Sequence, residues 1–207
     1  MNLVIIGPPG SGKDTQMAEL KSYMELEVIS AGDIARALAA KSDKCKKVVS
    51  EGGLLDDGLI FAEVQKKLDS LEKNVGVVFD GLPRTLHQAE LLNETLAHHD
   101  RVLDKVIYIS LDEEAIVERL SRRMVCSLCG ANITIGTIKC AECGGRPIRR
   151  ADDEPVVIIK RVQTYLENTL PLISYYRNKY MLIEVNGDQS IADVARDIRQ
   201  QLEGELG

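Results

Sequence analysis

The chain has 207 residues, enough for one full-sized domain with small insertions but too few for two large independent domains. Its 26 lysines and arginines face 32 aspartates and glutamates, and the net charge of -6 argues against a nucleic-acid-binding protein, so an anionic ligand must be held by local arginines. No apolar run approaches the roughly 20 residues of a membrane span, and Met1 leads into an apolar run without a charged leader, so we expect a cytoplasmic protein that binds no membrane.

A glycine-rich loop, GPPGSGKDTQ at residues 7–16, follows the first apolar run and precedes a helical pattern. Glycines let the backbone curl so that successive N–H groups face phosphate oxygens. The helix N-terminus adds a positive dipole, and Lys13 supplies a charge for the β- and γ-phosphates. The loop therefore predicts an ATP site formed by Gly10, Ser11, Gly12, Lys13, Asp14 and Thr15.

The end of this loop is unusual because Asp14 directly follows the lysine, and the expected hydroxyl comes one residue later, at Thr15. With this Gly-Lys-x-Thr-Gln ending, the loop resembles that of adenylate kinases and related nucleoside monophosphate kinases, and the resemblance extends over nearly the whole chain. That family usually has glycine where Asp14 stands. The departure puts a carboxylate beside a polyanion, which predicts weaker ATP binding or a bias toward Mg-bound nucleotide.

Two segments resemble the family's monophosphate-binding side. Residues 30–36, SAGDIAR, resemble the start of that lobe, and residues 53–55, GLL, resemble its far edge. Residues 80–85, DGLPRT, resemble the signature Asp-Gly-Phe-Pro-Arg, which implies that Arg84 binds phosphate and that Asp80 holds Mg²⁺ through water. The resemblance assigns AMP binding to Ala31, Arg36, Gly53, Leu54, Leu55, Gly81, Leu82, Pro83, Arg84, Gln88, Arg150 and Arg161.

Two of these residues give conflicting indications of the acceptor base. Gln88 matches the family position that hydrogen-bonds the edge of adenine, which favours AMP. Ala31 stands where adenylate kinases usually have threonine, and alanine there is more typical of kinases that act on UMP and CMP. We give Gln88 more weight because an amide reads a base edge directly. AMP is the predicted acceptor, and a UMP/CMP-type kinase is the alternative.

Five short apolar runs rich in β-branched residues predict strands at residues 3–6, 26–29, 75–79, 105–109 and 181–185. Segments with helical periodicity separate them, including Ile60, Val64 and Leu68. A long helix should begin at residues 154–155 and be kinked at Pro171. Strands alternating with helices predict an α/β fold with a five-stranded parallel sheet covered on both faces.

Residues 123–153 break this alternation, because they are rich in Cys, Gly and Thr and offer too little apolar surface for a core. Two C-x-x-C pairs, each followed by glycine, predict one tetrahedral Zn²⁺ without an open position, so the site should be structural. A redox dithiol or unligated thiols are the alternatives. The pairs resemble the zinc-bearing lid of bacterial adenylate kinases, and the predicted ligands are Cys126, Cys129, Cys140 and Cys143.

Several arginines on separate segments match family positions around the transferred phosphate. The resemblance implies that Arg119, Arg123 and Gln189 contact ATP, that Arg123 and Arg150 close on the phosphates, and that Arg161 joins Arg36 and Arg84 around the acceptor. We interpret Arg122 and Arg149 as solvated charges. The predicted catalytic residues are Lys13, Arg84, Arg123, Arg150 and Arg161.

The sequence therefore predicts a P-loop kinase that moves the terminal phosphoryl group of Mg-ATP directly onto AMP, giving ADP, with Mg²⁺ and a structural Zn²⁺. We expect a monomer. The predicted organisation is a core domain at 1–29, 58–122 and 153–207, a helical NMP-binding lobe at 30–57 and a zinc-binding lid at 123–152. A non-catalytic nucleotide-binding module is a further alternative, but such a module has no need of a set of arginines around one phosphate.

Overall fold

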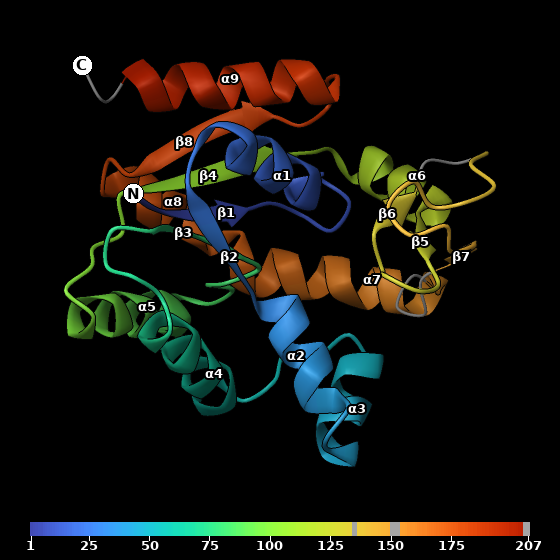
Figure 1. The fold of residues 1–207 in the computed structure, drawn as a ribbon, viewed down its shortest axis with the longest axis horizontal. Coiled ribbons are helices and arrows are strands. Elements are labelled where there is room, and N and C mark those ends of the chain that lie inside the picture. Colours follow the sequence, from blue (N-terminus) through green and yellow to red (C-terminus); the bar gives the residue numbers. More distant parts are fainter. Residues whose placement is uncertain (134–135, 150–153, 205–207) are drawn as a thin grey trace.

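The computed structural model describes residues 1–133, 136–149 and 154–204. Its centre is a parallel sheet of five strands in the order β2-β3-β1-β4-β8 (Figure 1). The strands are β1 (Asn2–Ile6), β2 (Leu26–Ser30), β3 (Gly76–Asp80), β4 (Lys105–Ser110) and β8 (Leu182–Asn186). Each predicted apolar run forms one of these strands, which confirms the α/β fold with a five-stranded parallel sheet.

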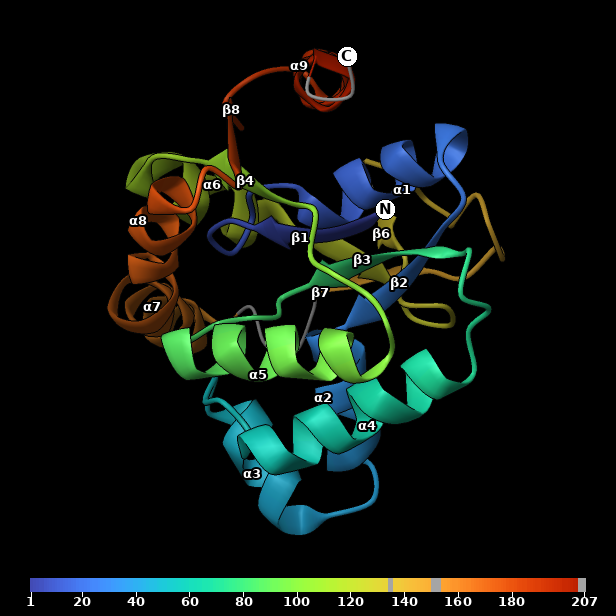
Figure 2. The ribbon, with the colours of Figure 1, turned by 90° about the vertical axis from the view of Figure 1, so that its left-hand side faces the viewer.

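Helices cover both faces of this sheet (Figure 2). Alternate residues of a strand point to opposite faces, so Leu3 and Ile5 join one core cluster while Val4 and Ile6 join the other. The first cluster lies beneath α1 (Lys13–Tyr23) and α9 (Ile191–Gly204). The second is covered by α4 (Asp57–Asp69), α5 (Leu86–His98) and α8 (Pro171–Asn178).

A side-chain bond joins α1 to the start of α9. Gln16, only 3% exposed, donates a hydrogen bond from Nε2 to the carbonyl oxygen of Ile191 over 3.1 Å. Met17 and Leu20 of α1 pack in the same core cluster as Val194 and Ile198 of α9. The helix that follows the glycine-rich loop is therefore supported by a segment that lies about 175 residues further along the chain.

Two short helices, α2 (Ala31–Ala39) and α3 (Asp43–Ser50), extend away from the sheet between β2 and α4 (Figure 1). Serines begin both helices: the Ser30 side chain accepts a hydrogen bond from the N–H of Asp33, and Ser42 does the same for Cys45. Cys45 is 6% exposed and packs in the core as a small apolar side chain.

The predicted insertion follows α6 (Glu113–Arg122) and forms an antiparallel sheet of its own in the order β6-β5-β7, called the small sheet below. Its strands are β5 (Met124–Cys126), β6 (Asn132–Ile133) and β7 (Pro147–Arg149). The small sheet lies beside α6 and α7 (Pro155–Thr164), apart from the large one (Figure 1).

The long helix predicted from 154–155 is interrupted as expected, but the irregularity begins before Pro171. A π-helical segment, Tyr165–Thr169, separates α7 from α8, and the N–H of Leu170 bonds the carbonyl of Tyr165 over 2.9 Å. Pro171 has no N–H and its ring crowds the preceding turn, so widening the helix ahead of it relieves the crowding. Among the residues that the structure describes, no helix is both long and apolar enough to cross a membrane.

Candidate active site

The glycine-rich loop joins β1 to α1 and wraps around the side chain of Lys13. Gly10 and Gly12 have φ values of 85° and 90°, a left-handed conformation that favours glycine. Lys13 Nζ donates hydrogen bonds to the carbonyl oxygens of Gly7 and Pro8, both at 2.9 Å. Burial lowers the pKa of Lys13 to about 8, although Asp80 and Asp14 oppose that change.

Asp80 ends β3 directly beside this loop. In the sheet register it pairs with Ile5 of β1 on one side and Ser30 of β2 on the other, so the carboxyl ends of three parallel strands meet here. Ser30 Oγ donates a hydrogen bond to Asp80 Oδ2 over 3.1 Å. Burial raises the pKa of Asp80, and the charge of Lys13 opposes the rise. The carboxylate can therefore hold the water shell of a cation next to the loop.

Arg84 is fixed from three directions. Its Nε donates to the carbonyl oxygen of Gly81 over 2.8 Å, its own N–H donates to Gln88 Oε1 over 2.7 Å, and its carbonyl accepts from Thr169 Oγ1 over 3.1 Å. Burial and the nearby charge of Arg36 lower the pKa of Arg84, and the charge of Asp80 raises it. The guanidinium nevertheless stays charged, because its pKa lies far above neutral pH. A half-buried cation held in place in this way suits an oxyanion.

Two of the predicted arginines, Arg84 and Arg161, lie near the third predicted cation, Lys13. Both Arg84 and Arg161 lower the pKa of Lys13, after burial as the main cause, so the three positive charges share one neighbourhood. Arg161 lies on α7 against Gly52, where an added Cβ would meet Arg161 Cγ at 3.3 Å. Arg150 lies outside the described residues.

The other residues predicted to bind AMP lie near α2, α3 and α5. Ala31 and Leu82 are buried, Leu55 is 9% exposed, and the N–H of Gly53 bonds the carbonyl of Val48 over 3.0 Å. Arg36 forms an exposed ion pair with Asp33 within α2. Leu54 lies between α3 and α4, and Gly81 and Pro83 lie between β3 and α5.

On the side predicted to bind ATP, α6 and the loop after β8 meet. Arg119 Nη2 donates a hydrogen bond to the carbonyl oxygen of Gly187 over 3.0 Å. A Cβ added at Gly187 would lie 2.6 Å from the carbonyl oxygen of Ser110, so the loop passes tightly over β4. The Gln189 side chain donates back to Asn186 within the loop. Arg119 and the Gln189 loop, predicted separately, are therefore neighbours.

Arg123 stands at the junction between α6 and β5, where the core leads into the small sheet. Arg122, its neighbour in sequence, pairs with Glu118 at 2.8 Å, and the two side chains are 66% and 59% exposed. This agrees with the interpretation of Arg122 as a solvated charge.

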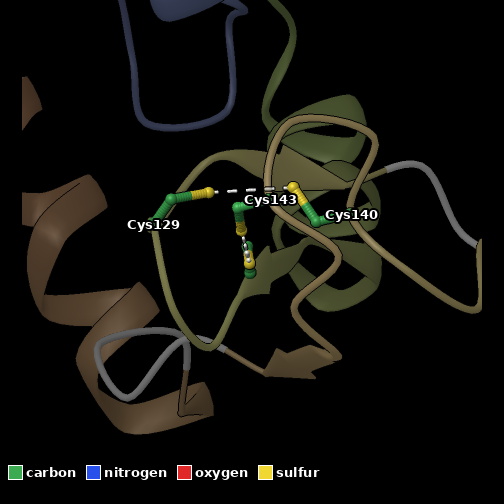
Figure 3. Close-up of side chains that lie close together, drawn as sticks. Cys129, Cys140 and Cys143 are labelled. Carbon is green, nitrogen blue, oxygen red and sulfur yellow. Dashed lines mark hydrogen bonds between the residues drawn. The ribbon is translucent and has the colours of Figure 1, made fainter.

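The four predicted zinc ligands come together at the end of β5 and in the loops of the small sheet, and Figure 3 labels three of them, Cys129, Cys140 and Cys143. The Sγ atoms of Cys126 and Cys143 lie 3.3 Å apart, those of Cys129 and Cys140 lie 3.7 Å apart, and all four are within 4.8 Å of one another. A tetrahedral zinc with Zn–S distances of about 2.3 Å separates its sulfurs by about 3.8 Å. The N–H groups of Cys129 and Leu128 lower the pKa of the Cys126 thiol, whereas the Cys143 thiol raises the pKa of Cys129, so the fit to zinc rests on the positions of the four sulfurs. The donor set therefore fits zinc.

Three residues that touch the predicted site were not among the residues predicted from the sequence. Asn132 of β6 donates to Asp14 Oδ2 over 3.3 Å, Asp57 accepts from Gln88 Nε2 over 2.6 Å, and Thr169 binds Arg84. Each contact joins segments that only the fold brings together. A sequence signal exists for Asp57 alone, as a second acidic residue at the start of α4, but two acids in a first helical turn usually indicate only a favourable dipole.

The parallel sheet and the glycine-rich loop ahead of α1, with the cations around Lys13, define the P-loop class of α/β proteins. A family model described as adenylate kinase matches residues 5–181. A relative named adenylate kinase from Fervidobacterium nodosum is 38% identical over 206 residues, covering 95% of this chain and 94% of the relative. Another so named, from Archaeoglobus fulgidus, is 36% identical over 213 residues and 98% of each chain is covered. The chain belongs to the adenylate kinase family.

Proposed function

We propose that the protein catalyses the reversible transfer of the terminal phosphoryl group of Mg-ATP to AMP, giving two ADP. Family membership and the names of its relatives support this reaction, and the observation that carries it is the convergence of Arg84, Arg161 and Asp80 on Lys13 in the glycine-rich loop. Phosphoryl transfer is catalysed mainly by positioning and by charge placed around the moving group, so no covalent intermediate is required.

On the donor side, the proposal assigns the ATP phosphates to the loop residues 10–15 and the nucleoside to Arg119, Arg123 and the loop containing Gln189. Successive N–H groups at the start of α1 face the phosphates, and Lys13 bridges the β- and γ-phosphates. Asp80 would hold Mg²⁺ through water, and the metal, when bound, neutralises the charge that develops on the transferred group.

On the acceptor side, Arg36, Arg84 and Arg161 would hold the AMP phosphate in line with ATP. The proposed NMP-binding lobe, residues 30–57, and the proposed lid, residues 123–152, would close over the core formed by 1–29, 58–122 and 153–207. Closure excludes water, which would otherwise accept the phosphoryl group. Arg123 and Arg150 would move onto the phosphates with the lid.

The family and the names of the relatives favour AMP over the UMP/CMP alternative. Zinc is proposed as a structural ion, because four thiolates leave no coordination position for substrate. A segment with so little apolar surface requires such a cross-link to stay folded. We further propose a monomer in the cytoplasm, where thiols remain reduced.

The test is a coupled assay of ADP formation with ATP and, separately, AMP, UMP, CMP or GMP. We expect AMP to be the best acceptor and Arg84→Ala to lower turnover by about 10². Arg122→Ala removes an exposed arginine and should leave turnover nearly unchanged. Binding of ATP without formation of ADP would instead indicate a non-catalytic module, and a higher kcat/KM with UMP or CMP would establish the alternative acceptor.

A further inference from the structure

The side-chain amide of Gln88 is held in one orientation. Gln88 is 3% exposed, its Oε1 accepts from the N–H of Arg84 over 2.7 Å, and its Nε2 donates to Asp57 Oδ1 over 2.6 Å. An N–H group can only donate and an ionised carboxylate can only accept, so exchanging the amide oxygen and nitrogen would leave two donors face to face and two acceptors face to face. Both neighbours therefore impose the same orientation.

The orientation determines which base edge the amide can still bind. Among the described residues, each amide atom has one protein partner, so Oε1 retains a lone pair and Nε2 retains one N–H. Adenine presents an amino donor beside the N1 acceptor and complements this pair. Hypoxanthine, the 6-keto analogue with the same ring shape, presents an acceptor beside an N1–H donor. Hypoxanthine could pair with Gln88 only if the side-chain amide rotated by about 180°, so that its oxygen and nitrogen exchanged places.

We propose that Asp57 is a positioning residue that sets the base preference of the acceptor site, because its carboxylate locks the Gln88 amide in the orientation that accepts amino bases and rejects keto bases. The inference rests on the proposed function and on Gln88 facing the acceptor base. It goes further by assigning the discrimination to Asp57, a residue that need not touch the nucleotide.

Asp57 is suited to this task by its position. It belongs to the first turn of α4, while Gln88 lies in the first turn of α5, so the bond ties two helices together beneath the proposed lobe. Its side chain is 28% exposed, and its other oxygen, Oδ2, lies 3.9 Å from His87 Nε2. A hydrogen bond to a charged acceptor is stronger than one between neutral groups. The bond to the Asp57 carboxylate therefore contributes more to the orientation of the Gln88 amide than the bond from the N–H of Arg84 does.

The experiment compares AMP with inosine monophosphate, which differs from AMP only by the keto group at C6 and the proton on N1. We expect the wild-type protein to prefer AMP, and Asp57→Ala to lower the ratio of the two kcat/KM values by at least about tenfold. The KM for AMP should rise while kcat changes little, since the reacting phosphates are untouched. Asp57→Asn should retain most of the preference, because its carbonyl oxygen still accepts from Gln88 Nε2.

The matched control is Asp56→Ala. Asp56 is the neighbouring acid and caps α4 by accepting from the N–H of Leu59 over 3.2 Å, so its loss loosens the same helix without freeing the amide. This variant should melt earlier but keep the ratio of AMP to inosine monophosphate. Asp57→Ser, which suits a first helical turn but is too short to reach the amide, provides a second measurement if the alanine variant folds poorly.

The experiment distinguishes a failure of the proposed function from a failure of the role proposed for Asp57. A wild-type protein that forms no ADP from AMP refutes the proposed function. A folded Asp57→Ala or Asp57→Ser protein that uses AMP with an unchanged ratio refutes only the role of Asp57, as would a wild-type protein that uses the two monophosphates equally well. A ratio that falls as far in Asp56→Ala as in Asp57→Ala would attribute the effect to loosening of α4 and overturn the inference.

Discussion

The amide of Asn132, in the small sheet, donates a hydrogen bond to the carboxylate of Asp14, in the glycine-rich loop, with 3.3 Å between Nδ2 and Oδ2. The contact connects the proposed lid to the proposed ATP site through Asp14, which stands where the resemblance predicts glycine. Asp14 is exposed, and it lies in the first turn of α1, where a carboxylate is stabilised by the helix dipole. The same turn is where the phosphates of ATP should bind.

Replacing Asp14 with Asn should strengthen ATP binding, because the substitution removes a negative charge beside the triphosphate and keeps the shape of the side chain. The side chain is exposed, so we expect a gain of about 1 kcal/mol, or roughly fivefold in Kd. The gain should be larger without Mg²⁺ than with it and should shrink as salt is added. Titration calorimetry at low and high ionic strength measures both.

Asn132→Ala is the control for this prediction, since it removes the hydrogen bond to Asp14 without changing any charge, whereas Asp14→Asn removes the charge and keeps an oxygen that can accept from Asn132. It should alter the Kd for ATP much less than Asp14→Asn does. A gain in Asn132→Ala as large as that in Asp14→Asn would contradict the role assigned to the charge of Asp14.

Lys13 should take up a proton when ATP binds at alkaline pH. Burial lowers its pKa to about 8 in the free protein, so it begins to lose its charge as the pH rises through that value, and bound phosphates raise the pKa again. Below that range Lys13 is protonated in both states and no uptake is expected. Calorimetry in two buffers of different ionisation enthalpy, at about pH 7 and about pH 9, measures the uptake.

Lys13→Met provides the control for the proton measurement, because its side chain has similar length and does not titrate. We expect no linked uptake in this variant at either pH. Wild-type binding that involves no proton near pH 9 would contradict the lowered pKa of Lys13.

Arg123 and Arg122 form a matched pair for testing the charges near the proposed lid. Arg123→Ala should lower kcat by about 10², because the proposal places that cation on the transferred phosphate. Arg122→Ala should have little effect, since Arg122 pairs with Glu118 at an exposed surface. Steady-state rates with saturating ATP and AMP measure kcat for both variants. Equal losses of kcat in the two variants would contradict the proposed role of Arg123.

The cysteine cluster should hold about one zinc per chain, and Cys140→Ser should lower both metal content and thermal stability. Cys45→Ser is the control, because Cys45 is buried in the core, away from the cluster, and its replacement should leave the metal content unchanged. Elemental analysis and thermal melting report on the two effects. A metal-free wild-type protein as stable as a zinc-loaded one would rule out the structural ion.

The sequence predicted those parts of the molecule that depend on local pattern. The run at residues 3–6 is apolar throughout because both faces of β1 are covered, and the glycines at 10 and 12 are needed where φ is positive. The two C-x-x-C pairs each aim two thiols at one point whatever the surrounding fold.

Contacts between segments far apart in sequence could not be predicted in the same way. The bond from Gln88 to Asp57 exists because α4 and α5 pack side by side, and the bond from Asn132 to Asp14 depends on where the small sheet lies relative to the loop. The π-helical segment before Pro171 is similar, since its last residue, Thr169, donates to the carbonyl of Arg84, which lies 85 residues away in the sequence. Secondary structure follows from periodicity, whereas these bonds follow from tertiary docking.

The hydrogen bond from Gln16 to the carbonyl of Ile191 has a consequence for the order of folding. The glycine-rich loop is synthesised before α9, but the helix that supports it packs against α9, and closing so long a stretch of chain carries an entropic cost. A nascent chain that ends before α9 should therefore present the loop on a partly uncovered apolar face, as a chaperone substrate and not yet as a nucleotide site.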